Sequence, residues 1–205
     1  MVGTVEITGL QSLNEIATLD DRVKRSASRA LNTTAKRQRT EAARRVRRQV
    51  SFPANYLSPT GNRPRLYVSK QANPASLQTR ITGRFRPTSL TRFLLNRPSP
   101  RDRRAVLQVA PGRRTVIPRA FLIPLRQGNV RTDEKFNRGL AIRLRPGERL
   151  YNKHRAVRLR GNLYLLYGPS VQQVLLDNSG DGVFTRLERP TADFLESEFL
   201  RLLGL

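Results

Sequence analysis

Residues 12–50, SLNEIATLDDRVKRSASRALNTTAKRQRTEAARRVRRQV, decide the fold of this chain. No Pro or Gly interrupts the stretch, and its apolar residues from Leu19 onward recur at steps of mostly three or four, the spacing of one helix face. Ser12 and Glu15 have the spacing of a capping box, which satisfies free backbone N–H groups at a helix N-terminus. The sequence therefore predicts one helix over residues 12–50, about 55 Å long.

The predicted helix has two distinct faces. The apolar face is narrow and rich in Ala, which favours close packing against a flat partner such as a sheet. The other face is basic, and it is either a solvated surface or a surface held against phosphates or a partner's carboxylates. The basic side chains that share this sector, with Arg44 beside them, are Arg22, Arg25, Arg29, Lys36 and Arg47.

Short apolar runs separated by Pro, Gly and Asn predict strands. One short strand is expected at residues 2–7, before the helix. Three weaker runs lie among basic loops and predict an extended wing with edge strands, at 66–68, 77–81 and 90–94. The stronger runs, expected to form a mainly antiparallel sheet beneath the long helix, are 105–109, 115–125, 140–144, 156–159 and 162–167. Pro118 and Pro124 make 115–125 an edge strand or a bulged one.

Two helices are predicted near the end of the sequence. Ser170 and Gln173 form a second capping box, ahead of a short helix. Thr191 is the predicted N-cap of the last helix, and Gly204 is expected to end it. We expect this last helix to dock on the sheet or on a neighbouring copy of the chain.

The predicted fold class is α+β, with a long N-terminal helix packed on a mainly antiparallel sheet, a basic extended wing and a C-terminal helix. Within one domain overall, residues 1–58 hold the first strand and the long basic helix. Residues 59–104 form the basic wing with a flexible joint at its end. Residues 105–205 form the sheet core with the C-terminal helix.

The chain is strongly basic, with 39 Lys and Arg against 15 Asp and Glu, a formal net charge of +24. Of these 39, 34 are Arg, whose planar fork bonds phosphates and carboxylates in pairs. Residues 42–101 contain no acidic residue, whereas six acidic residues face three Arg from Asp177 to Leu205. This polarity either favours head-to-tail association of copies or simply reflects charges spread along a basic protein.

The clustering of Arg gives the candidate surface for DNA or for an acidic partner. Contact with DNA is expected to be independent of base sequence, because aromatic residues that could stack on bases make up only 6% of the chain. The candidate residues are Arg22, Arg25, Arg29, Lys36, Arg44, Arg45, Arg47, Arg48, Arg101, Arg103, Arg104, Arg113 and Arg114.

Enzymatic motifs are missing from the sequence. The segment 168–170, GPS, is no nucleophile elbow, because Gln172 stands where the motif requires Gly. The single His, His154, lies among charged neighbours and is expected on the surface. With no Cys there are no disulfides or thiolate metal sites. We therefore expect no catalytic activity and no cofactor. We also expect a soluble product without an export signal, since neither a signal peptide nor a long apolar span is seen.

One loop has the spacing of a calcium-binding EF-hand. Asp177, Ser179 and Asp181 occupy loop positions 1, 3 and 5, and Glu188 occupies position 12. Pro190, however, lies where the exiting helix should run. A turn built on Asp, Asn and Gly is therefore favoured over a metal site.

The order of four segments resembles the minor tail protein Z family of lambda-like tailed bacteriophages. They are ITGL at 7–10, RALNTTAKRQRTEAARRVR at 29–47, IPRAFL at 117–122 and LYGPSVQQVL at 166–175. YGPSV at 167–171 is the most specific part, and ALNTTA at 30–35 comes second. The resemblance spans residues 5–203, although the wing does not match residue for residue.

The resemblance implies a structural virion subunit for tail completion. Such a subunit would form a ring, hexameric in keeping with tail symmetry, at the head-proximal end of the tail, where it helps join head to tail and positions the genome. Implied partners are other copies, tail tube or terminator proteins, head connector proteins and genomic DNA in the channel. The implied location is the tail or neck of the virion, and the host cytoplasm during assembly. The residues assigned to contacts between subunits are Tyr167, Ser170, Val171, Phe194 and Phe199.

The alternative is a monomeric, sequence-independent nucleic-acid-binding protein of ribosomal or DNA-coating type. A charge of +24 is typical of that class. The acidic, apolar C-terminal helix and the YGPSV segment favour the virion subunit, because a plain nucleic-acid binder needs neither.

Overall fold

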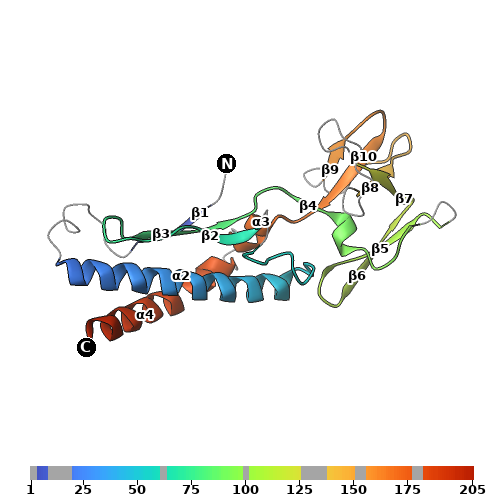
Figure 1. Cartoon of the computed structure of the whole chain (residues 1–205). Helices are drawn as coiled ribbons and strands as arrows, with labels where there is room; N and C mark the ends of the chain where they lie inside the picture. The colour runs from blue at the N-terminus through green and yellow to red at the C-terminus, as the bar shows by residue number, and fades with distance from the viewer. Residues whose placement is uncertain are drawn as a thin grey trace. The chain divides into compact units, whose positions relative to one another are not determined.

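The computed structural model has an α+β fold with a long N-terminal helix, a C-terminal helix and antiparallel sheets, which confirms the predicted fold class (Figure 1). It describes residues 4–8, 20–60, 64–98, 102–125, 138–150, 156–176 and 182–205. The helices are α2 (Asp21–Gln49), α3 (Val171–Leu175), α4 (Val183–Leu203) and the short 3₁₀ helix η1 (Leu90–Phe93). The strands are β1 (Thr4–Thr8), β2 (Leu66–Lys70), β3 (Gln78–Gly83), β4 (Thr88–Ser89), β5 (Arg104–Ala110), β6 (Arg113–Pro118), β7 (Ala120–Pro124), β8 (Arg138–Arg143), β9 (Ala156–Arg158) and β10 (Leu163–Gly168).

The chain divides into two compact units, each assembled from separate segments. Unit 1 comprises Met1–Arg47, Ala54–Phe85 and Val171–Leu205, and unit 2 comprises Arg48–Pro53 and Arg86–Ser170. The segment predicted as a wing supplies β2 and β3 to unit 1, and β4 and η1 to unit 2.

Helix α2 begins later than the sequence predicted. The backbone N–H of Arg22 donates to Asp20 Oδ1 at 2.6 Å, and that of Lys24 donates to the Asp20 carbonyl at 3.0 Å, so Asp20 caps the helix. The prediction of one continuous helix from Ser12 was wrong, because this Asp offers a competing start. Ser12 and Glu15 lie outside the described residues. The 29 residues of α2 span about 44 Å rather than about 55 Å.

The Ala-rich face of α2 packs on the three-stranded sheet of order β1-β3-β2 in unit 1 (Figure 1). Asn32 ties the helix to this sheet, since its amide donates to the Ala72 carbonyl at 2.9 Å and accepts from the Ala72 N–H at 2.8 Å. The sequence predicts the strands after residue 105 as the partner of this helix, but its Ala-rich face packs on β1-β3-β2 instead. Of the edge strands predicted in the wing, β2 does lie at the edge of this sheet, whereas β3 is central, with Thr79 and Ile81 buried.

Helix α4 packs beside α2 in unit 1. Leu195 of α4 contacts the buried cluster of Leu31, Ala72 and Leu77, which combines helix and sheet residues. The Arg22 guanidinium donates to the Leu203 carbonyl at 3.2 Å. The first turn of α2 and the last turn of α4 thus meet in unit 1.

The start of α4 differs from the prediction, and its end confirms it. The helix begins at Val183 after Gly182 and continues through Pro190, so Thr191 is not its N-cap. Pro inside a helix costs about 3 kcal/mol. Burial of Val183 and other apolar side chains in the first turns offsets this cost. Gly204 ends the helix with a φ of 85°, a left-handed conformation that Gly adopts without strain.

Unit 2 contains a sheet of order β4-β10-β8-β7, with β9 also paired to β10, and a β5-β6 hairpin. The predicted strand at 115–125 is in fact two strands, β6 and β7, because Arg119 between them has a φ of 59°. The predicted strand at 90–94 was wrong, since residues 90–93 form η1. The other strands predicted from residue 105 onward, at 105–109, 140–144, 156–159 and 162–167, are confirmed as β5, β8, β9 and β10. None of the described helices is both long and apolar enough to cross a membrane.

Candidate nucleic-acid interface

The basic sector predicted for α2 is exposed, but half of its side chains make contacts within the chain. Arg22 donates to a carbonyl of α4, Arg44 pairs with Glu41 at 2.9 Å, and Arg47 donates to the Ala54 carbonyl at 2.8 Å. The other three, Arg25, Arg29 and Lys36, are exposed and form no ion pair with a described carboxylate. Only part of this sector is therefore available to an external anion.

Arg39 on the same helix has a structural role that the sequence did not reveal. Its Nε donates to the Leu66 carbonyl at 3.0 Å, and its Nη2 donates to the Leu57 carbonyl. Burial, together with the nearby charge of Arg47, lowers the pKa of the Arg39 guanidinium. This cation fastens the helix to the segment that leads into β2, and is not a surface site.

The remaining predicted arginines have differing surroundings. Arg45 pairs with Glu41 at 3.2 Å, and Arg48 is exposed at the end of α2. Arg104 pairs with Asp102 at 3.0 Å, and this partner raises the pKa of Arg104 through a hydrogen bond and its charge. Arg101 lies outside the described residues. The other three are exposed: Arg103 lies just before β5, and Arg113 and Arg114 begin β6.

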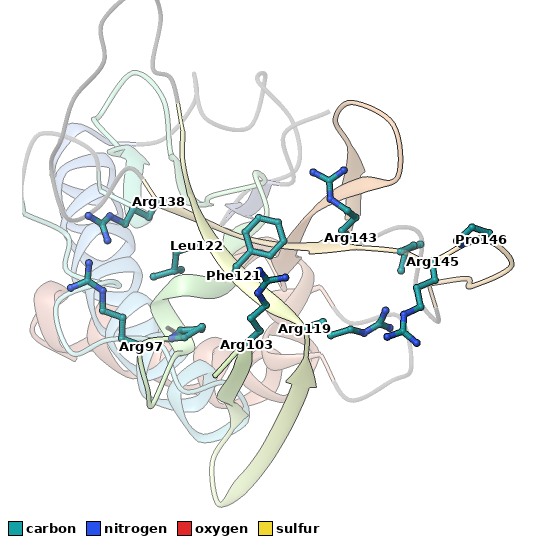
Figure 2. Close-up of a pocket in the computed structure, with 11 residues that line it drawn as sticks. Arg97, Arg103, Arg119, Phe121, Leu122, Arg138, Arg143, Arg145 and Pro146 are labelled. Atoms are coloured by element: carbon teal, nitrogen blue, oxygen red, sulfur yellow. The ribbon is translucent and has the colours of Figure 1, made fainter. Parts of the chain in front are cut away.

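Unit 2 contains a cavity of about 1010 Å³ with six arginines in its lining, here called the six-arginine cavity (Figure 2). Arg138 and Arg143 stand at the two ends of β8, and Phe121 and Leu122 come from β7, the end strand of the sheet. In Figure 2, Arg97 and Arg138 lie at one side of the cavity and Arg143 and Arg145 at the other. The described residues of the lining are Arg97, Pro98, Arg103, Arg119, Phe121, Leu122, Arg138, Arg143, Leu144, Arg145 and Pro146.

One ion pair fixes a wall of this cavity. Arg119 Nη2 donates to Glu148 Oε1 at 2.6 Å, and the backbone N–H of Arg145 donates to Glu148 Oε2 at 2.8 Å. The hydrogen bond from Arg119, then that from Arg145, lowers the pKa of the Glu148 carboxyl. Glu148 thereby connects the residue before β7 to the turn that follows β8.

The other five arginines of the cavity form no ion pair with a described carboxylate. A guanidinium keeps its proton at any physiological pH, so these charges are permanent. The described lining of the cavity therefore combines several positively charged guanidiniums with apolar side chains.

No family model, curated protein or solved structure matches this chain. The assignment of a role consequently depends on the residues themselves and on their arrangement.

Five of the six cavity arginines were not among the predicted site residues, and only Arg103 was. Arg138, Arg143 and Arg145 flank an apolar strand, a pattern that sequence alone assigns to solvated strand ends. Their common site exists only because β8 pairs with β7 and because the segment around Arg97 and Arg103 lies nearby. No local signal in the sequence reports that pairing.

The residues assigned to contacts between subunits fall into two groups. Ser170 and Val171 are buried inside the chain, so they present no surface to a second copy in this structure. Tyr167, Phe194 and Phe199 are partly exposed. Burial raises the pKa of the Tyr167 hydroxyl.

A second cavity, of about 660 Å³, is lined by α2 and α4 in unit 1. Phe194 belongs to its lining, and the guanidinium of Arg37 lies 4.0 Å from the centre of the Phe194 ring. This cation–π contact already occupies one face of the ring.

The calcium-like spacing gains no support from the described part of the chain. Glu188 lies on α4 and is exposed, whereas Asp177, Ser179 and Asp181 fall outside the described residues. Among the described side chains, no group of three His, Cys, Asp or Glu could hold a metal ion.

Proposed function

We propose that this chain is a structural subunit of a bacteriophage tail or neck. In this role it forms a ring at the head-proximal end of the tail, helps join head to tail, and positions the genome. The uneven charge of the two units carries the proposal. Unit 2 has 21 Lys and Arg against four Asp and Glu, a net of +17, whereas unit 1 has 18 against 11, a net of +7.

This division of charge suits a subunit that meets both DNA and protein. A densely basic unit attracts a polyanion such as the DNA that passes through a neck channel. Unit 1 instead exposes carboxylates on α4, among them Asp193 and Glu196, together with the apolar Leu200. Such a surface fits the basic side of a neighbouring copy or of a tail or head connector protein.

The chemistry of the six-arginine cavity favours a structural role over a catalytic one. The charged groups among its described lining residues are guanidiniums, which neither accept nor release a proton near neutral pH. They hold an anion in place but offer no general acid or base. The segments resembling the minor tail protein Z family supply the biological setting, and no cofactor is proposed.

A monomeric, sequence-independent nucleic-acid-binding protein is the second candidate. The six-arginine cavity favours it too, because unpaired guanidiniums bind phosphates whether or not the protein assembles. Assembly therefore distinguishes the two functions.

The test is the mass of the purified chain measured by light scattering over a range of salt, alone and with tail or neck proteins. We expect a discrete oligomer of about six subunits, or one that forms only with those partners, and a ring in negative-stain electron micrographs. Duplex DNA is added in a parallel series. A chain that stays monomeric with every partner, yet binds duplex DNA tightly at low salt, would contradict the virion proposal and support the alternative.

A further inference from the structure

We propose that the six-arginine cavity of unit 2 binds the phosphodiester backbone of DNA without reading its sequence. This inference rests on the proposed function, since it assigns the DNA contact of a tail or neck subunit to one site. It places that contact on residues such as Arg97, Arg138 and Arg143, rather than on the basic face of α2 or the tip of the β5-β6 hairpin.

The first argument is that five of the cavity's arginines have no carboxylate partner among the described residues. Arg119 alone among its six arginines has a carboxylate partner in the described chain, Glu148 at 2.6 Å. The basic face of α2 differs, because Arg22, Arg44 and Arg47 are already held by groups of the same chain. An external anion therefore meets five arginines without a described carboxylate partner in the cavity, whereas the helix sector leaves three basic side chains available, Arg25, Arg29 and Lys36.

The spacing of the arginines favours a polymer over a single phosphate ion. Arg138 and Arg143 begin and end β8, which places their Cα atoms about 17 Å apart at about 3.4 Å per residue. Figure 2 shows their guanidiniums on opposite sides of the cavity, so the two do not converge on one point. A DNA strand carries one phosphate per about 3.4 Å of helix axis, so two arginines this far apart can contact different phosphates of one strand but not one ion.

The lining explains why the contact would be strong and insensitive to sequence. Phe121 and Leu122 are consecutive on β7 and point to opposite faces of the strand, so the cavity extends around the edge of the sheet. These apolar walls displace water, which strengthens the attraction between guanidinium and phosphate. Among the described lining residues there is no amide or carboxylate side chain to read adenine or cytosine, and guanidiniums that contact phosphates carry no sequence information.

A second copy of this chain is a poorer occupant than DNA. Its most acidic described element is α4, but Glu198 there is paired with Arg201 at 2.8 Å. Glu188 lies between Arg186 and Arg189, which leaves Asp193 and Glu196 as the exposed carboxylates of α4 with no basic residue between them. These two carboxylates can meet a small basic patch of a neighbouring copy, but they do not match the positive charge of a cavity lined by six arginines.

The test compares a cavity variant with a matched control in the full-length chain. The cavity variant is Arg97→Gln with Arg143→Gln, and the control is Arg113→Gln with Arg114→Gln at the tip of the β5-β6 hairpin. Both remove two exposed positive charges from unit 2. Binding to a random-sequence duplex is measured by fluorescence anisotropy over a range of salt, and circular dichroism checks that each variant is folded.

We expect the slope of log affinity against log salt concentration to fall by about 1.8 in the cavity variant, about 0.9 for each lost phosphate contact. The control should retain nearly the full slope. Replacement of Arg97 and Arg143 by Lys should also retain it, because an ammonium still displaces a counterion from the DNA. If the double Gln variant does not fold, the single Gln variants should each lower the slope by about 0.9.

Several results would overturn the inference. An unchanged slope in the cavity variant, or an equal fall in the control, would remove the cavity from DNA binding. Binding of poly-glutamate, measured in the same way, represents an acidic protein partner. If the cavity variant loses poly-glutamate binding but keeps its DNA binding, the cavity is a site for an acidic protein. Displacement of the duplex by inorganic phosphate, but not by sodium chloride of equal ionic strength, would indicate a site for one phosphate ion.

Light scattering on the same samples separates this inference from the proposed function. A ring whose DNA slope is unaffected by the cavity substitutions contradicts the inference alone. A chain that stays monomeric even with tail and neck proteins, and whose slope falls by about 1.8, supports the cavity and contradicts the ring.

Discussion

Arg119 combines a strained backbone with a strong ion pair. Its φ of 59° lies in the left-handed region, which costs a residue with a side chain about 1 kcal/mol. The conformation turns the chain from β6 into β7 and directs the guanidinium to Glu148, 2.6 Å away. Because Glu148 also accepts from the Arg145 N–H, one carboxylate orders two segments of the cavity wall.

This arrangement predicts how the stability of unit 2 depends on pH. The pKa of Glu148 is lowered from its ordinary value of 4.5, so its ionised form stabilises the fold above that pH. The stabilisation is lost as the pH falls through the lowered pKa. The melting temperature of the wild type should therefore exceed that of Glu148→Gln at about pH 7, and the difference between them should shrink towards about pH 3.

The partner residue supplies the control for this prediction. Arg119→Gln removes the main cause of the lowered pKa, so exchanging Glu148 for Gln in that background should have a smaller and less pH-dependent effect. A difference between wild type and Glu148→Gln that is the same at every pH would show that the carboxylate charge is not what stabilises this wall.

At the scale of elements, the YGPSV segment has a packing role. Gly168 ends β10 where a Cβ would lie 2.9 Å from Phe93 Cε2 and 3.2 Å from Leu90 Cδ2, both on η1. Phe93 is buried, and its ring has little freedom to move aside. Gly therefore lets the strand and the 3₁₀ helix approach closely.

Gly168→Ala should lower the free energy of unfolding of unit 2 by about 1–3 kcal/mol, the usual cost of overpacking. Urea denaturation followed by circular dichroism measures the change. Phe93→Leu in the same chain should relieve the clash, so the double variant is expected to lose less than the sum of the single variants. Simple additivity would contradict this account.

Much of the element order could be predicted from short apolar runs bounded by Pro, Gly and Asn, because β5, β8 and β10 coincide with such runs. The errors arose where tertiary packing overrides local signals. Residues 90–94 are apolar enough to predict a strand, yet residues 90–93 form the 3₁₀ helix η1, which packs against β10. Pro190 marks a helix boundary locally, but burial of the preceding turns carries α4 through it.

The candidate site was harder to predict than the fold. A helical wheel places Arg25 and Arg29 on an exposed face from sequence alone, and the structure agrees. The six-arginine cavity instead needs the pairing of β7 with β8 and the approach of the segment near Arg97, contacts between residues distant in sequence. Charge clustering along the chain carries no information about such contacts.

At the scale of the whole molecule, the two units should respond to core substitutions separately. Leu31 is buried in unit 1 and Leu140 in unit 2, and Leu→Ala at either site removes about 2–5 kcal/mol. We expect Leu31→Ala to speed amide hydrogen exchange mainly in α2, β3 and α4, and Leu140→Ala mainly in β7, β8 and β10. Equal acceleration across all strands in both variants would mean that the molecule opens as one cooperative block.

The hydrogen bond from Arg22 to the Leu203 carbonyl joins residues 181 positions apart. During translation, α2 therefore leaves the ribosome long before α4 is synthesised. Until then, the cluster of Leu31, Ala72 and Leu77 lacks its contact with Leu195. Most of unit 2 is one continuous segment, Arg86–Ser170, which can close in the meantime. During this interval the nascent chain contains a nearly complete unit 2 and an incomplete unit 1 whose apolar side chains are not yet covered. A chaperone therefore finds the most exposed apolar surface at this stage of synthesis.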